Sequence, residues 1–304
     1  MLYRPLRYDK SKAVLLETDF CWDVDDVGAL SLLLTAARRH GFRVAGISVN
    51  CPRPESAAAV AAILKVHGMS QVPVGLSAEA GPDASPYLAL LADWITAEER
   101  AALAPLDSRE LYQMVLEDTP DQSLTVISIG FFNVLDQVWR KWPELFERKV
   151  DTVIAMAGSF LFESGYREFN IAHAYAEAAA DFIDHYPGRM IFSGFEVGYD
   201  VFTDLSSKRG LNHPVIVAYQ AFNAANQPGA PSWRRPSWDP CAVDFAVNGE
   251  GARYRLGPNS DIRVVDGVTV FREAPNASRA FVIQNLDSQS LGEYISGSIL
   301  EGIS

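Results

Sequence analysis

Residues 13–40 read AVLLETDFCWDVDDVGALSLLLTAARRH, and this stretch decides the fold class. Ala13 to Leu16 is a short apolar run, which is typical of a buried strand. Val27 to His40 has the length and composition of a helix, and the acidic segment between the two is the loop that joins them. The stretch therefore predicts a strand followed by a helix, the first part of a β–α–β unit.

The same order of elements recurs along the chain. Strands are predicted at residues 44–49, 124–129, 152–156 and 190–192, and helices at residues 56–67, from Gly130 to Trp139, 174–185, 214–222 and 291–300. Short strands that alternate with helices build a mainly parallel sheet. We therefore expect an α/β fold with an open, mainly parallel, Rossmann-like central sheet and helices on both of its faces.

The pattern changes near the C-terminus. Residues 253–271 contain Gly257, Pro258 and Asp266-Gly267 between β-rich pieces, which predicts an extra β-hairpin near the sheet edge. We expect one α/β domain over residues 1–304, because no Pro-, Gly- or Ser-rich linker interrupts the chain.

The composition restricts the class of partner. A chain that is 48% hydrophobic and 21% charged has enough apolar material for a large core. The net charge of −12 argues against a nucleic-acid partner, because phosphate binding needs a surplus of Lys and Arg on one face. Trp233, Arg234 and Arg235 form a local basic and aromatic spot, which we interpret as a solvated loop.

Cysteine usage and hydropathy bear on the compartment. The 3 cysteines are widely spaced without a C-x-x-C pair, which favours a reducing compartment. The first eight residues lack the apolar run of a signal peptide, and no segment has the length of a membrane span. We expect a cytoplasmic protein with no membrane partner, although a signal peptide that was already removed would leave no trace.

The acidic loop holds Asp19, Asp23, Asp25 and Asp26 within eight residues at a strand end. At about 5 Å and an effective dielectric constant near 20, each like-charge pair costs about 3 kcal/mol, so the cluster needs a cation, protons or water. Calcium tolerates the irregular oxygen coordination that such a loop offers. Alternatively, some of these aspartates cap the helix that follows, and the loop alone leaves both interpretations open.

Other polar residues follow the predicted strands. In open parallel sheets, ligands bind at the carboxyl ends of the strands. Those positions are the loops at residues 19–26, Asn50, residues 130–133, 158–170 and 194–196.

Four motifs along the chain carry a family resemblance. They are Leu15-Leu16-Glu17-Thr18-Asp19 with Asp23-Val24-Asp25-Asp26, then Ile129-Gly130-Phe131-Phe132-Asn133, Glu168-Phe169-Asn170-Ile171, and Trp238-Asp239-Pro240-Cys241-Ala242-Val243. Their order resembles that of the inosine–uridine-preferring nucleoside hydrolases, in the variant with two extra residues before the paired aspartates. The resemblance extends over most of the chain.

The resemblance implies a calcium-dependent N-ribohydrolase that splits a ribonucleoside into ribose and base. The implied metal ligands are Asp19, Asp26, Asp239 and the carbonyl of Phe132 or a neighbour. Asp19 would also deprotonate the attacking water. The implied substrate contacts are Asp25 and Asn170 to the ribose hydroxyls, Glu168 near the 5′ side, and Asn50 as a further polar contact. Oriented carboxylates suit this reaction, because positive charge develops on the sugar as the bond breaks. A homo-oligomer, dimer or tetramer, and a role in purine salvage are further expectations from the resemblance.

The chain departs from the family pattern around the acidic loop. Glu17 stands where the family usually has Asp, and Cys21 where it usually has Gly. Asp23 has no counterpart in the shorter motif, so it is open whether this residue binds metal, substrate or solvent. The run Phe131-Phe132-Asn133 is one residue shorter than usual, which weakens the assignment of the carbonyl ligand.

Trp238 stands where many members carry a His that protonates the departing base. An indole N–H cannot act as an acid, but the ring can stack on a base, as an aromatic residue does in the purine-preferring branch. The alternative is that Trp238 only packs against the sheet. His173 is a candidate acid, with a surface or capping role as its alternative, and Glu196 is a candidate pocket residue.

Two other functions stay open. A diverged, calcium-containing homologue would bind a sugar-like ligand without hydrolysing a nucleoside. Phosphoryl transfer with magnesium is less favoured, because the sequence has no G-x-x-x-x-G-K-[ST] loop and places no basic residue near the cluster.

Overall fold

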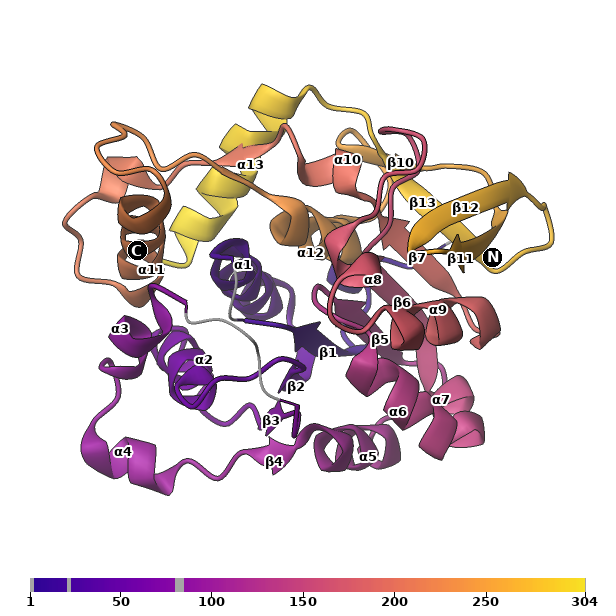
Figure 1. Cartoon of the computed structure of the whole chain (residues 1–304). Coiled ribbons are helices and arrows are strands. Elements are labelled where there is room, and N and C mark those ends of the chain that lie inside the picture. The colour runs from indigo at the N-terminus through magenta and orange to yellow at the C-terminus, as the bar shows by residue number, and fades with distance from the viewer. Residues whose placement is uncertain (1–2, 21–22, 80–84, 304) are drawn as a thin grey trace.

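The computed structural model describes residues 3–20, 23–79 and 85–303, and their strands form a nine-stranded central sheet (Figure 1). The strands, in spatial order, are β10 (Tyr254–Leu256), β13 (Arg279–Gln284), β7 (Met190–Ser193), β6 (Val150–Met156), β5 (Leu124–Ser128), β1 (Ala13–Thr18), β2 (Arg43–Val49), β3 (Val74–Leu76) and β4 (Leu106–Asp107). Every neighbouring pair is parallel except β10 with β13. The prediction of an open, mainly parallel sheet is confirmed.

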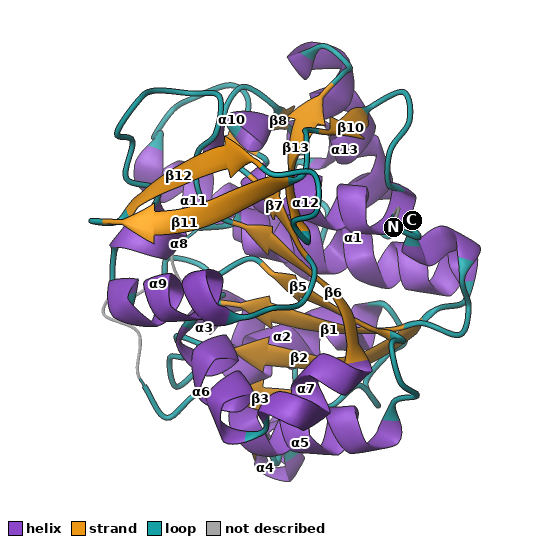
Figure 2. Cartoon of the chain, turned by 90° about the vertical axis from the view of Figure 1, so that its right-hand side faces the viewer, coloured by secondary structure: helices purple, strands orange, loops and turns teal. Residues whose placement is uncertain are grey.

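Helices cover both faces of this sheet (Figure 2). One face packs against α1 (Asp25–His40), α2 (Ser56–Val66), α11 (Pro214–Asn226), α12 (Trp238–Asn248) and α13 (Ser288–Glu301). The other face packs against α5 (Ser108–Asp118), α6 (Asn133–Lys141), α7 (Pro143–Lys149) and α9 (Ala176–His185).

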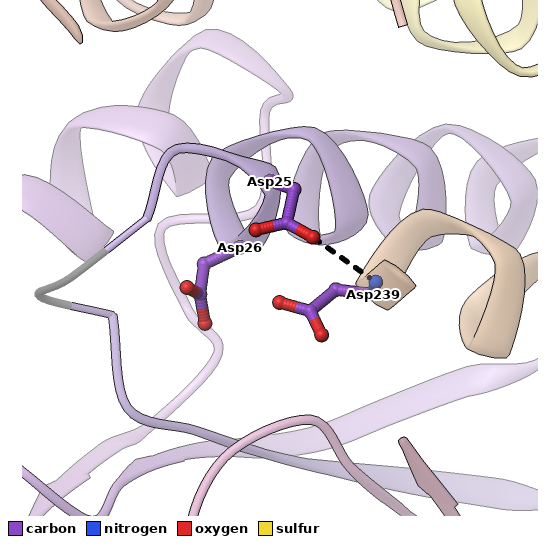
Figure 3. Close-up of side chains that lie close together, drawn as sticks. All are labelled: Asp25, Asp26 and Asp239. Atoms are coloured by element: carbon purple, nitrogen blue, oxygen red, sulfur yellow. Dashed lines mark hydrogen bonds between the residues drawn. The ribbon is translucent and has the colours of Figure 1, made fainter. Parts of the chain in front are cut away.

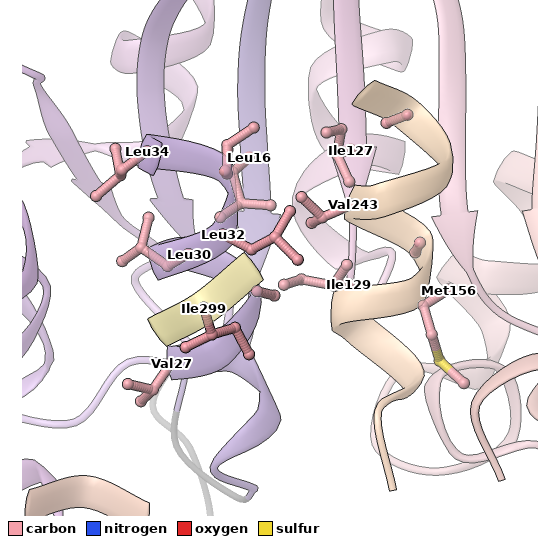
Figure 4. Packing of buried hydrophobic residues seen from close by; sticks show 14 of the residues in the cluster. Leu16, Val27, Leu30, Leu32, Leu34, Ile127, Ile129, Met156, Val243 and Ile299 are labelled. Carbon is pink, nitrogen blue, oxygen red and sulfur yellow. The ribbon is translucent and has the colours of Figure 1, made fainter. Parts of the chain in front are cut away.

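Strand β1 shows why the sheet is buried on both sides. Successive side chains of a strand point to opposite faces. Val14 and Leu16 accordingly join one hydrophobic cluster, and Ala13 and Leu15 join the other. Figure 4 shows the first cluster, in which α1 and α12 pack against the central strands. A strand buried on both faces reads as a continuous apolar run, which is why this one could be predicted.

Several shorter elements complete the described chain. They are η1 (Leu6–Tyr8), α3 (Leu88–Ala92), α4 (Ala97–Ala102), α8 (Phe169–Ala172), α10 (Phe195–Gly198), η2 (Ser206–Lys208), and the two small antiparallel sheets β8 (Phe202–Thr203) with β9 (Arg235–Pro236) and β11 (Ser260–Val265) with β12 (Val268–Glu273). Within the described residues, no helix combines the length and the apolar character needed to cross a membrane.

The predicted C-terminal hairpin is present as β11 and β12. Asp266 and Gly267 form its turn with φ angles of 52° and 75°, the left-handed conformation that two-residue hairpins require. The predicted range began earlier, at residue 253, because β10 is also β-rich. β10 instead pairs with β13 at the edge of the central sheet.

Most predicted helices differ from the observed ones only at their ends. α1 begins at Asp25 instead of Val27, because the paired aspartates occupy its first turn. α13 begins at Ser288 instead of residue 291, because the Asp287 carboxylate accepts a hydrogen bond from the Ser290 N–H at 2.9 Å and caps the helix.

The parallel arrangement positions the functional loops. Strands β1, β2, β5, β6 and β7 run in the same direction, so their carboxyl ends lie at one edge of the sheet. The predicted polar loops leave from these ends and meet there.

Candidate functional site

A pocket of about 450 Å³ lies at the carboxyl edge of the sheet. Most of the predicted site residues line it, namely Asp19, Asp23, Asp25, Asp26, Glu168, Asn170, Trp238 and Asp239. Residues to which the sequence assigned no role in the site also line it, among them Ile129, Met156, Phe169, Phe222, Asn226 and Arg235.

Three carboxylates converge in the pocket. Asp25, Asp26 and Asp239 each offer an oxygen, and these oxygens lie within 4.8 Å of one another (Figure 3). Asp25 and Asp26 stand in the first turn of α1, and Asp239 stands in the first turn of α12. The N–H of Asp239 donates to Asp25 Oδ2 at 3.2 Å, which ties the two helix ends together.

Burial makes these negative charges costly. All three side chains are at most 5% exposed, and none forms an ion pair within the described chain. Desolvation first, and repulsion between the carboxylates second, raise the pKa of Asp25 and of Asp239 well above the ordinary value. Oxygen donors without a protein cation suit a hard divalent ion, so the residues present fit a metal such as calcium. Helix capping alone does not explain a cluster that spans two helices.

Asp19 lies beside Asp26, outside this closest group of three. Burial, and then nearby negative groups, raise the pKa of Asp19 well above its ordinary value. The Asp26 carboxylate is fixed by the Thr18 hydroxyl and by the Phe20 N–H, which donates at 3.3 Å. The expected metal ligands were Asp19, Asp26 and Asp239, whereas the closest group of carboxylates contains Asp25 in place of Asp19. Which of Asp19 and Asp25 binds the metal stays a prediction.

Glu168 and Asn170 form one unit at the start of α8. The Glu168 carboxylate accepts hydrogen bonds from the backbone N–H groups of Gly158, Asn170 and Ile171 at 3.0, 2.9 and 3.3 Å. Asn170 Nδ2 donates to the carbonyl of Met156 at 3.0 Å, at the end of β6. Burial raises the pKa of Glu168 to about 7. Glu168 therefore orders the loop that presents Asn170 to the pocket.

Trp238 forms part of an aromatic wall. Its ring stacks on Phe195 with a centroid distance of 5.4 Å, and its Nε1 donates to the carbonyl of Phe195 at 2.9 Å. Trp238 is only half-buried and lines the pocket. The residue thus packs against α10 and still leaves part of its surface toward the cavity.

Asp23, which had no assignment, pairs with Arg235. The Arg235 Nε donates to Asp23 Oδ1 at 2.7 Å, and Nη2 donates to Oδ2. The interpretation of residues 233–235 as a solvated loop is wrong for Trp233, which is buried, and for Arg235, which is partly buried and lines the pocket. The expectation of no basic residue near the acidic cluster is wrong for the same reason. Arg234, its neighbour, is exposed and lies over the ring of Phe202.

Asn50 and Phe132 lie behind the pocket and do not line it. Asn50 is fully buried, and its Nδ2 donates to the carbonyl of Phe131 at 2.7 Å. The Phe132 side chain lies in the core, and its carbonyl accepts the Asp136 N–H at 2.9 Å in the first turn of α6. Within residues 129–133, Ile129 is the residue that lines the pocket, three positions before Phe132, and the carbonyl ligand at Phe132 or a neighbour stays a prediction.

Glu196 and His173 also lie outside the lining. Glu196 Oε1 accepts from the N–H groups of Phe160 and Leu161, both at 3.2 Å, so it orders the loop after β6. His173 is exposed and stacks on Phe169 at 4.4 Å, and only Phe169 faces the cavity.

Glu17 and Cys21 depart from the family pattern, and the structure describes only the first of them. Glu17 is fully buried, its Oε2 accepts the hydroxyl of Tyr112 at 2.8 Å, and burial raises the pKa of Glu17 to about 8. The longer side chain thus reaches a partner on α5. Cys21 lies outside the described residues.

Some of the lining residues without a predicted role could have been found from the sequence, and others could not. Ile129 and Met156 stand at the ends of predicted strands, so their position was foreseeable. Phe222 and Asn226 lie one turn apart on α11 and had no chemical signal in the sequence.

Comparison with known proteins identifies the fold. No model of a protein family matches the chain, and no curated protein matches it. Among solved structures, an inosine-uridine preferring nucleoside hydrolase from Bacillus anthracis matches with a TM-score of 0.69 at 17% identity, over 95% of this chain and 99% of that chain. An inosine-guanosine nucleoside hydrolase matches with a TM-score of 0.72 at 15% identity, over 96% and 98%.

A third structure is the type III effector protein XopQ complexed with adenosine diphosphate ribose. It matches with a TM-score of 0.70 at 15% identity, over 98% of this chain and 97% of that chain. These matches cover nearly the whole of both chains. The chain therefore has the nucleoside hydrolase fold.

Proposed function

We propose that this protein is a metal-dependent N-ribohydrolase that cleaves the N-glycosidic bond of ribonucleosides. The observation that carries the proposal is the convergence of Asp25, Asp26 and Asp239 in a pocket that also contains Asn170 and Glu168. The fold supports it, because the similar solved structures include nucleoside hydrolases.

The reaction needs a base, a sugar clamp and charge stabilisation. Asp19 accepts a proton from the attacking water, and Asp25 and Asn170 hold the ribose hydroxyls, with Glu168 toward the 5′ side. The buried carboxylates stabilise the positive charge that develops on the sugar, because their negative charge is poorly screened in this environment. Asn50 supports this arrangement from behind the pocket, through the Phe131 carbonyl.

We propose calcium as the metal. Its ligands would be Asp26, Asp239, one of Asp19 and Asp25, and a backbone carbonyl near Ile129. When bound, a divalent cation lowers the pKa of a water molecule and orients it. Calcium is favoured over magnesium because it tolerates irregular coordination, and these donors come from three separate segments of the chain.

The substrate is proposed to be a purine nucleoside. Trp238, Phe195, Phe169 and Phe222 give the cavity broad aromatic surfaces, and a two-ring base buries more area against such surfaces than a one-ring base does. This preference, a role in purine salvage and a homo-oligomeric state remain predictions.

Ribose release from inosine, guanosine, adenosine, uridine and cytidine tests the activity. The protein is assayed as purified, after treatment with a chelator, and after addition of calcium or magnesium. We expect hydrolysis of purine nucleosides that chelation abolishes and calcium restores. No ribose from any nucleoside at saturating calcium would reject the proposal.

The alternative is a diverged homologue that binds a sugar-like ligand without hydrolysis. In that case ribose analogues would raise the unfolding temperature of the calcium-loaded protein, while no substrate would turn over. Phosphoryl transfer gains Arg235 as a cation near the carboxylates, but the guanidinium is already paired with Asp23. A phosphatase assay with magnesium discriminates this reaction.

A further inference from the structure

The pocket has a cation on its aromatic side. Arg235 is the only positively charged residue among the described residues that line the cavity. Its guanidinium carbon lies 5.3 Å from the ring centre of Trp238 and 5.1 Å from that of Phe222. Arg235 therefore lies beside the aromatic surfaces on which a base would stack.

The Asp23 pair fixes this guanidinium and leaves part of it available. Asp23 occupies Nε and Nη2, and Nη1 makes no hydrogen bond within the described part of the chain. A guanidinium has five N–H groups in one plane and stays charged in proteins, so the remaining donors can serve a ligand. The ion pair holds the plane in one orientation before any ligand arrives.

The proposed reaction creates a need for such a donor. When the N-glycosidic bond breaks, its electron pair stays on the base, which then carries negative charge. No histidine is among the described residues of the lining, and the indole of Trp238 donates its N–H to Phe195 and cannot supply a proton. A fixed cation stabilises the departing anion without transferring a proton.

We propose that Arg235, oriented by Asp23, binds the departing base of the riboside and stabilises its negative charge. This inference rests on the proposed N-ribohydrolase function. Water oxygen bonds to the anomeric carbon as the bond to the base nitrogen breaks, and Asp19 takes the proton lost by the water. The base leaves with the electron pair and is protonated by solvent, so Arg235 keeps all its protons.

The inference defines a substrate class. The preferred ribosides have a base that leaves as an anion and presents an acceptor nitrogen or oxygen to the guanidinium, as purines do. A riboside whose leaving group is already a stable anion at neutral pH, such as 4-nitrophenyl riboside, needs this help least.

The test compares these two leaving groups. Values of kcat/KM for inosine and for 4-nitrophenyl riboside are measured with wild type, Arg235→Met, Arg235→Lys and Arg234→Met. For Arg235→Met we expect the value for inosine to fall about 10- to 100-fold, which corresponds to the loss of one charged hydrogen bond, and to fall at least tenfold more than the value for 4-nitrophenyl riboside. Arg235→Lys keeps the charge and should recover part of the inosine activity.

The controls separate chemistry from structure. Arg234→Met removes an adjacent, exposed arginine outside the pocket and should change neither value by more than about twofold. Unfolding temperatures show which variants are folded, and Arg235→Lys and Asp23→Asn carry the comparison if Arg235→Met does not fold. For Asp23→Asn we also expect inosine to be affected more than 4-nitrophenyl riboside, because Arg235 loses its orientation.

Two results would overturn the inference alone. Equal losses on both substrates would mean that the ion pair only holds the loop, and no loss on either would mean that Arg235 does not contact the base. If wild type hydrolyses neither substrate with calcium present, the proposed function is rejected, and the inference falls with it.

Discussion

Replacing Asp239 by Asn should stabilise the metal-free protein and weaken metal binding at the same time. Asp239 meets Asp25 and Asp26 with carboxylate oxygens within 4.8 Å, and none of the three has an ion-pair partner in the described chain. Asn has almost the same shape, and the N–H that donates to Asp25 belongs to the backbone and is kept. The substitution therefore removes the charge and leaves the packing nearly unchanged.

The gain has an upper limit. At 4.8 Å and an effective dielectric constant near 20, each of the two pairs costs about 3.5 kcal/mol. Desolvation and this repulsion raise the pKa of Asp239, so uptake of a proton avoids part of the cost in the wild type. The free energy of unfolding of Asp239→Asn without metal should therefore exceed that of wild type by about 2 to 4 kcal/mol, less than the summed repulsion of the two pairs.

The sign of the pH dependence provides a second check. A carboxyl group whose pKa is raised in the folded state contributes stability that is lost as pH rises toward that pKa. Subtracting the variant from wild type removes the titrating groups that lie far from Asp239. In chelator, the advantage of Asp239→Asn should grow as pH rises above the ordinary carboxyl pKa of 3.8. With saturating calcium, the order should reverse, because the variant loses a ligand.

Urea unfolding with and without chelator measures these differences. Asp244→Asn is a matched control, because Asp244 stands on the same helix and is 1% exposed, but it pairs with Arg253 at 2.8 Å. Removing that carboxylate should destabilise the protein by about 3 kcal/mol whether or not calcium is present. If Asp239→Asn behaved like Asp244→Asn in chelator, the reasoning from unpaired charge would be refuted.

Three further substitutions test the site. Asp19→Asn should lower kcat about 10²- to 10⁴-fold in a protein that still folds cooperatively, and an active variant would exclude Asp19 as the base. Trp238→Ala should raise KM for purine nucleosides about tenfold or more, whereas Trp238→Phe should keep most of the affinity, so equal losses would argue against stacking. Gly130→Ala should abolish ribose release, because the added Cβ would lie 2.5 Å from the Asp19 backbone nitrogen; full activity would show that this loop can move.

The order of elements could be predicted because each signal is local. A strand buried on both faces must be apolar along its length, and the following helix must be apolar where it contacts the sheet. The carboxyl ends of parallel strands share one edge, so the loops that begin at Asp19 and Asn50 were expected to lie together. For Asp239, more than two hundred residues away, the expectation came from the motif that it resembles.

The position of Arg235 could not be predicted. Two adjacent arginines look alike in sequence, but one lines the pocket and the other is exposed. The difference comes from the short pairing of Phe202–Thr203 with Arg235–Pro236, which fixes the path of the chain just before α12. Strands of two residues carry no periodic signal.

The position of Arg235 changes how the charge of the pocket is understood. Five aspartates and Glu168 line it, and one arginine and one divalent cation would together leave three negative charges if all six carboxylates are ionised. In the proposed reaction the sugar would become positive beside the carboxylates of Asp25, Asp26 and Asp239, and the base would become negative beside Trp238 and Arg235. An N-glycosidic bond placed between the two would break along the electric field of the site, and this arrangement would favour the transition state over the uncharged substrate.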